Sequence, residues 1–141
     1  MAVNANSWKR LPIADRDQAF NADEAFLRIT EWARGSAEKF NSLYLWTNPQ
    51  KPTGAKDTYR LPIADIMEGG RPHLIPHAVF TAAAILSGAH GGLVDVISEQ
   101  ERLKLKGVVT DIYATLAHQY GDSRVNPPWL RGGNKEEDVT A

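Results

Sequence analysis

The sequence has no cysteine among its 141 residues. This absence excludes a disulfide framework and metal sites built on thiolates. A surplus of positive charge is also missing, because 16 Lys and Arg residues stand against 17 Asp and Glu residues for a net charge of −1. DNA-binding proteins usually carry such a surplus to displace counterions from phosphates, so we expect no direct contact with nucleic acid.

Long apolar runs are missing as well. The longest, "AVFTAAAILSGA" at residues 78–89, is far shorter than the roughly 20 residues that cross a bilayer. Residues 1–17 lack the apolar core of a signal peptide, and no basic amphipathic helix suited to a membrane surface is visible. We therefore expect a soluble protein that is made inside the cell and has no membrane partner.

Three segments have the apolar spacing and the end signals of α-helices. The first covers about residues 22–34 and follows Asn21, a suitable N-cap. The second begins at Pro76, a residue favoured in the first helical turn, and is apolar on nearly all sides. The third begins after Ser98 and ends at Gly121, which suits the position after the last turn.

The remaining regular segments read as strands. Residues 41–47, "NSLYLWT", are short and aromatic, and two extended runs flank "EGG" at 68–70, which predicts a hairpin. Pro62 cannot donate to a ladder, so its strand should lie at an edge or be paired only in part. The predicted fold class is α+β, with three helices packed on a small antiparallel sheet and extended N- and C-terminal arms.

The chain has the length of one domain. Residues 1–20 show no helical period, and Pro12 favours extended backbone before it, which predicts an N-terminal arm. The compact α+β core is then expected over residues 21–121. Residues 122–141 contain "NPPWLRGG" and an acidic end, which predicts an extended C-terminal tail.

Each predicted arm carries one tryptophan, Trp8 and Trp129, and a tryptophan is costly to leave in water. One interpretation is that each ring folds back on its own core. The other is that both are anchors in a partner's pocket, with neighbouring residues as fasteners. The partner-binding residues would then be Trp8, Arg10, Leu11, Ile13, Pro128, Trp129, Leu130 and Arg131.

No motif indicates a catalytic site. His73 and His77 are four residues apart, as metal ligands on a helix often are, but Pro76 lies between them at the expected helix start. The two side chains would then not share a helical face, and histidines near a helix end explain them equally well. We expect no catalytic residues, no metal and no cofactor.

The hexapeptide "RLPIAD" occurs twice, at residues 10–15 and 60–65. The flanking residues do not match, so duplication of a whole domain is not the explanation. Leu–Pro–Ile is stiff, extended and apolar, and the Asp that follows can close the segment with a turn. Either both copies pack on the core, or both dock on similar surfaces, one of them outside this molecule.

The two copies, the Ala-rich helix and the "GAHGGLVD" segment together resemble a tailed-bacteriophage head-module domain. That domain is small and is often fused C-terminal to prohead proteases. The resemblance covers about residues 11–120, with matching stretches at Leu11 to Phe20, Leu61 to Asp65, Ala82 to Leu86 and Gly88 to Asp95. It implies that the repeated hexapeptide belongs to the layout of one domain.

The resemblance also implies a function. The family offers no catalytic residues to carry over, and a free-standing domain of this kind resembles a capsid decoration (cement) protein. Such a protein, made in the host cytoplasm, would bind the major capsid protein on the outer surface of the virion, stabilise the head and self-associate into a small oligomer on the lattice. Two alternatives stay open: a transient head-assembly factor that binds the protease or scaffold, and a small metal-dependent hydrolase using His73 and His77.

Overall fold

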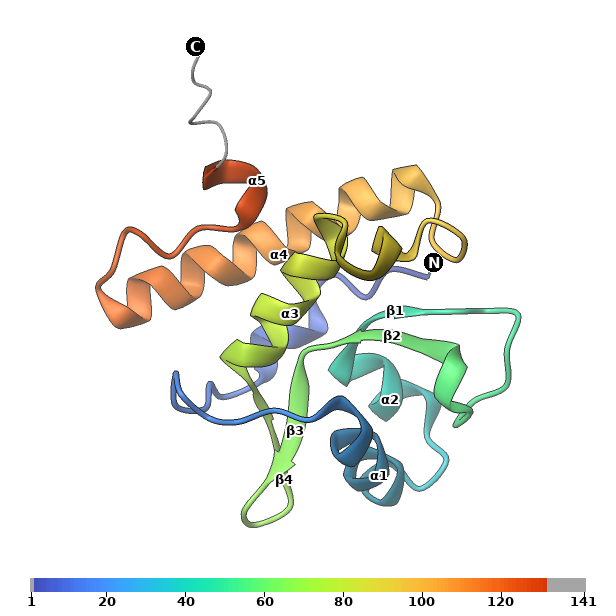
Figure 1. Cartoon of the computed structure of the whole chain (residues 1–141). Coiled ribbons are helices and arrows are strands. Elements are labelled where there is room, and N and C mark those ends of the chain that lie inside the picture. The colour runs from blue at the N-terminus through green and yellow to red at the C-terminus, as the bar shows by residue number, and fades with distance from the viewer. Residues whose placement is uncertain (1, 132–141) are drawn as a thin grey trace. The chain divides into compact units, whose positions relative to one another are not determined.

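The computed structural model describes residues 2–131, apart from the side chains of His90 and Arg131. Within that range it has five α-helices and two small antiparallel sheets of two strands each (Figure 1). This confirms the predicted α+β class, with two helices more than expected. The chain divides into two compact units, Met1–Thr81 and Ala82–Ala141, and the boundary falls inside helix α3 (Pro76–Leu86).

Helix α1 (Ala22–Ala33) forms in the first unit where the sequence predicts it. The Asn21 side chain accepts a hydrogen bond from Glu24 N at 3.0 Å, which satisfies one of the free donors of the first turn. The inward face of the helix carries Ala25 and Ile29, which are fully buried. Burying these apolar groups holds α1 against the strands of the same unit.

A second helix, α2 (Ala37–Leu43), covers the start of the segment 41–47, so the strand predicted there is too long. Ser36 caps this helix by accepting a hydrogen bond from Lys39 N at 3.2 Å. The strand begins only at Tyr44, where the run of large aromatic and branched side chains begins.

The strands form two antiparallel pairs. Strand β1 (Tyr44–Thr47) pairs with β2 (Tyr59–Pro62), and β3 (Ala64–Met67) pairs with β4 (Arg71–Leu74). The second pair confirms the hairpin predicted around "EGG". Both glycines of that turn have positive φ, 86° and 76°, a backbone conformation that residues with a side chain rarely adopt.

The start of the segment predicted as an extended N-terminal arm, residues 1–20, pairs with β1 inside the first unit. Residues 2–4 pair with β1: Asn4 N donates to Leu45 O at 2.8 Å, and Thr47 N donates to Ala2 O at 2.9 Å. These bonds satisfy backbone groups at one side of β1. Pairing of this segment with β1 satisfies backbone donors and acceptors on both sides and covers a strand edge that would otherwise be exposed.

The two RLPIAD copies lie on opposite edges of β4. In the first copy, Leu74 N donates to Pro12 O at 2.8 Å and Ala14 N donates to Leu74 O at 2.9 Å. In the second copy, Ile63 O accepts from Ile75 N at 2.9 Å. Because successive residues of a strand direct their backbone groups to opposite edges, β4 is held between the two copies.

The copies share a sequence and a partner strand but not a backbone conformation. Leu11 has φ −88°, whereas Leu61 has φ 60° and is buried. The first copy runs parallel to β4 at Ile13, and the second runs antiparallel to it at Ala64. Both copies therefore pack within the unit, as the first interpretation of the repeat expects.

The second unit is built around α4 (Glu99–Tyr120), which confirms the predicted long helix. Ser98 caps its start by accepting from Glu101 N at 3.2 Å, and Gly121 ends it in the left-handed conformation. Before it, a short 3-10 helix spans Ala89–Leu93. The buried apolar side chains on this helix include Leu105, Val109, Ile112 and Leu116.

A short helix, α5 (Pro128–Arg131), forms in the segment predicted as an extended tail. Pro128 suits the first helical position because its missing N–H would have no partner there, and Leu130 N donates to Pro127 O at 3.0 Å. The rest of the predicted tail, residues 132–141, lies outside the described residues. Among residues 2–131, no helix has the length and apolar character needed to cross a membrane.

Candidate binding site

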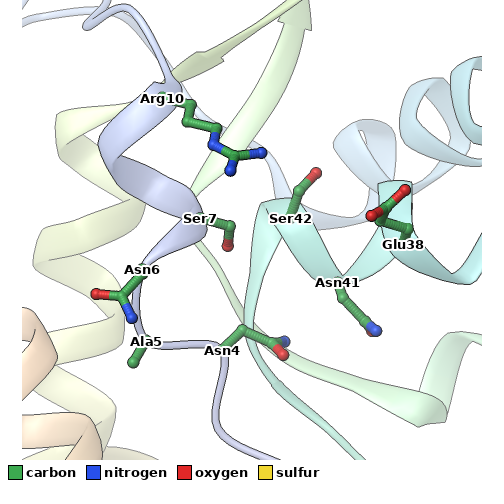
Figure 2. Close-up of a pocket in the computed structure, with 8 residues that line it drawn as sticks. All are labelled: Asn4, Ala5, Asn6, Ser7, Arg10, Glu38, Asn41 and Ser42. Atoms are coloured by element: carbon green, nitrogen blue, oxygen red, sulfur yellow. The ribbon is translucent and has the colours of Figure 1, made fainter.

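An open cleft of about 520 Å³ lies in the first unit between the N-terminal segment and α2 (Figure 2). We call it the N-terminal cleft. Seven of its eight lining residues have polar side chains, so it can offer hydrogen bonds to a partner. Its lining residues are Asn4, Ala5, Asn6, Ser7, Arg10, Glu38, Asn41 and Ser42.

Hydrogen bonds hold one wall of this cleft in place. Asn4 Nδ2 donates to Tyr44 O at 2.8 Å and to Thr47 Oγ1 at 3.1 Å. Thr47 Oγ1 in turn donates to Asn41 Oδ1 at 2.7 Å, so its bond ties α2 to the N-terminal segment. The amide nitrogen of Asn41 donates to no other residue in 2–131 and remains available to a partner.

The cleft carries one charge of each sign. Arg10 and Glu38 are both exposed, and neither forms an ion pair with another residue in 2–131. In Figure 2 the Arg10 guanidinium extends from the 3-10 turn Ser7–Arg10 over the opening toward α2. A partner surface can therefore meet a cation, an anion and amide groups within one small area, an arrangement typical of specific polar recognition.

The predicted partner-binding residues of the N-terminal segment divide between core and surface. Trp8 is only 7% exposed, and its Nε1 donates to Ala5 O at 3.1 Å, so the ring packs on its own chain. Leu11 and Ile13 are half-buried. Arg10 alone of these four is exposed and lines the cleft. An anchoring role for Trp8 in a partner's pocket would require the turn to open.

The predicted residues of the C-terminal segment also contact their own unit. Trp129 Nε1 donates to Thr110 Oγ1 at 2.9 Å, and Lys106 Nζ lies 5.5 Å from the centroid of the Trp129 ring. Pro128 is half-buried, while Leu130 is 53% exposed. The Arg131 side chain lies outside the described part of the molecule.

His73 and His77, the residues of the alternative hydrolase hypothesis, have separate surroundings. His73 Nδ1 lies 3.2 Å from Arg71 O, and the exposed His77 ring meets Phe80 edge-on. Among the described residues, no group of three or more His, Asp or Glu side chains is arranged to hold a metal ion.

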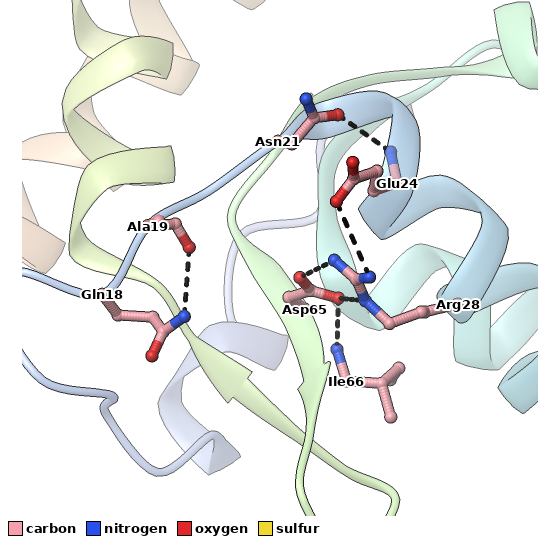
Figure 3. Close-up of polar contacts among 7 residues, drawn as sticks. All are labelled: Gln18, Ala19, Asn21, Glu24, Arg28, Asp65 and Ile66. Carbon is pink, nitrogen blue, oxygen red and sulfur yellow. Dashed lines mark hydrogen bonds and ion pairs between the residues drawn. The ribbon is translucent and has the colours of Figure 1, made fainter.

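An ion pair that the sequence did not indicate joins α1 to β3 (Figure 3). Arg28 Nε donates to Asp65 Oδ1 at 2.9 Å and Arg28 Nη2 donates to Asp65 Oδ2 at 2.7 Å, a bidentate contact. The Asp65 hydrogen bond raises the pKa of Arg28 further above its ordinary value. Asp65 also accepts from Ile66 N at 2.7 Å. The last residue of the second RLPIAD copy thus has a structural role that the exposed Asp15 of the first lacks.

Comparison of the chain with protein-family models, with curated proteins and with solved structures gave no match. The resemblance to a phage head-module domain therefore stays a prediction from the sequence.

Proposed function

We propose that this protein is a non-enzymatic phage capsid decoration protein that binds the major capsid protein on the outer surface of the head and stabilises the lattice. The sequence resemblance over residues 11–120 supports this proposal. The placement of both RLPIAD copies beside one strand is consistent with it, since it makes the repeat part of one structural unit.

The observation that carries the proposal is a set of polar groups in the N-terminal cleft that have no partner among residues 2–131. Arg10, Glu38 and the Asn41 amide nitrogen line the cleft and are open to a partner. A single cleft of this kind gives modest affinity. On a shell with many identical sites, self-association of the bound copies would raise the overall strength of attachment through avidity.

The test is co-sedimentation of the purified protein with undecorated heads over a range of salt concentrations. We expect saturable, stoichiometric binding to mature heads that weakens with salt, because exposed charges are screened. Arg10→Ala should raise the dissociation constant by about five- to tenfold, in the range of one lost charged contact. Lys9→Ala is the matched control, since Lys9 is the exposed neighbour that does not line the cleft.

Two results would contradict this proposal. Absence of binding to mature heads, together with binding to immature heads that contain protease or scaffold, would favour a transient assembly factor instead. Equal losses from Arg10→Ala and Lys9→Ala would show that the N-terminal cleft is not the contact surface.

A further inference from the structure

A second cleft in the first unit, of about 640 Å³, combines aromatic, apolar and basic side chains. We call it the aromatic cleft. It lies between the end of α1, the start of α2 and the β3–β4 hairpin, and its volume is in the range of ligand-binding pockets. Its lining residues are Arg28, Glu31, Trp32, Arg34, Lys39, Ile66, Met67 and Gly70, which comprise three cations and one anion.

The three cations are not equivalent. Arg28 is committed to Asp65 through two short hydrogen bonds, so its charge is already balanced. Arg34 and Lys39 are exposed, and neither forms an ion pair with another residue in 2–131. Lys39 Nζ lies 5.0 Å from the centroid of the Trp32 ring, a cation–π contact that holds the ammonium group over the aromatic surface.

The apolar part of the cleft is firmly supported. Trp32 and Ile66 are half-buried and pack against the core cluster around Phe40. Ile66 is further positioned because its backbone N–H donates to Asp65 Oδ1. The cleft therefore offers an apolar surface beside two cations, which fits a peptide with several carboxylates next to an apolar side chain. A nucleic acid would need a surplus of positive charge, and the chain has a net charge of −1.

Only one segment of the sequence has three consecutive carboxylates beside an apolar side chain. Residues 136–139 read Glu-Glu-Asp-Val, three carboxylates followed by a branched apolar side chain. They lie outside the described residues. The other acidic residues near the chain's ends, such as Asp15 and Asp17, are separated by Arg16 and have no apolar neighbour of this kind after them.

We infer that the aromatic cleft of one copy binds residues 136–139 of a second copy, with Arg34 and Lys39 meeting the carboxylates and the Trp32–Ile66 surface meeting Val139. This contact joins two different surfaces, so it is heterologous and produces closed rings or open chains. It goes beyond the proposed function, because self-association through this cleft needs no capsid and is measured without one.

The test uses sedimentation velocity of the full chain over a range of concentrations at low and moderate salt. The wild-type protein should associate as its concentration rises, and salt should weaken the association. A double variant of the cleft, Arg34→Glu with Lys39→Glu, should raise the dissociation constant about tenfold or more, because it replaces attraction by repulsion. A double variant of the acidic segment, Glu136→Lys with Glu137→Lys, should have the same effect.

A mixing experiment identifies the contact. The cleft variant and the acidic-segment variant each repel themselves, but in a 1:1 mixture every cleft meets a segment of opposite charge, so association should return. The control is Lys9→Glu with Lys104→Glu. This variant changes the net charge by the same amount as the cleft variant, but at exposed positions outside the cleft, so it should associate as the wild type does. Far-UV circular dichroism of each variant verifies that it is folded.

Three outcomes would overturn the inference. The wild-type protein could remain monomeric at every concentration and salt level. The charge variants could associate as strongly as the control. Both variants could lose association without recovery on mixing. In that case the segment would bind within its own chain, or the cleft would contact a different surface of the partner copy.

Discussion

Replacing Arg28 by methionine isolates the contribution of the ion pair between α1 and β3. Methionine keeps most of the apolar stem of arginine, so the change removes the guanidinium with little loss of packing. The Asp65 side chain is only 9% exposed, and it would keep one hydrogen bond, from Ile66 N, after losing two from Arg28.

The expected cost follows from the unequal exposure of the two partners. Removing one member of a fully buried ion pair costs about 3–5 kcal/mol, because the other charge is left without compensation. The Arg28 side chain is 45% exposed, so water already screens the pair and the loss is smaller. We expect Arg28→Met to lower the free energy of unfolding by about 2 kcal/mol, a large part of the 5–15 kcal/mol that is typical of a domain.

Urea unfolding followed by far-UV circular dichroism at pH 7 measures this cost. Arg34→Met is the matched control: Arg34 caps the same helix and forms no ion pair with the described residues, so its replacement should change stability by about 0.5 kcal/mol or less. Adding Asp65→Asn to Arg28→Met should recover part of the loss, because no buried charge then remains. Equal effects of Arg28→Met and Arg34→Met would refute the reasoning.

Two further predictions concern single side chains. Burial, and next the charges of Tyr59 and Asp65, raise the pKa of the Tyr44 phenol above its ordinary value of about 10. The native state thus keeps a proton that the unfolded chain loses, so stability should fall as pH rises above about 10, and Tyr44→Phe should flatten that fall in urea titrations between about pH 9 and 11. An unchanged slope would contradict this assignment. Trp129→Phe should lower the free energy of unfolding by about 1 kcal/mol, because it removes the hydrogen bond to Thr110. Leu130→Ala, at an exposed neighbouring position, should lower it by less than half as much. Equal unfolding midpoints for the two variants would show that this bond does not stabilise the fold.

Local signals in the sequence were sufficient for the parts of the fold that depend on neighbouring residues. The caps Asn21 and Ser98 lie directly beside the helices that they begin, and the glycines of the EGG turn need only their own backbone freedom. The helix α2 escaped prediction because the aromatic residues after it gave a stronger strand signal than Ser36 gave for a helix.

Features that depend on distant residues could not be found in this way. Asp65 and Arg28 are 37 positions apart, and nothing in either neighbourhood marks them as partners. The identical hexapeptides take different backbones at Leu11 and Leu61, which shows that the surrounding structure decides their conformation. Both clefts are assembled from separate segments, so composition alone did not reveal them.

The position of β4 between the two hexapeptides has a consequence for how the protein is made. Leu74 bonds to Pro12 and Ala14, residues that leave the ribosome long before it does. The first copy therefore cannot form these bonds until the β3–β4 hairpin has been synthesised. Contacts across such a separation slow folding, since a long loop must close before they form. During that interval the backbone groups of Pro12 and Ala14 that later bond to Leu74 lack this partner and are open to chaperones or to other strands.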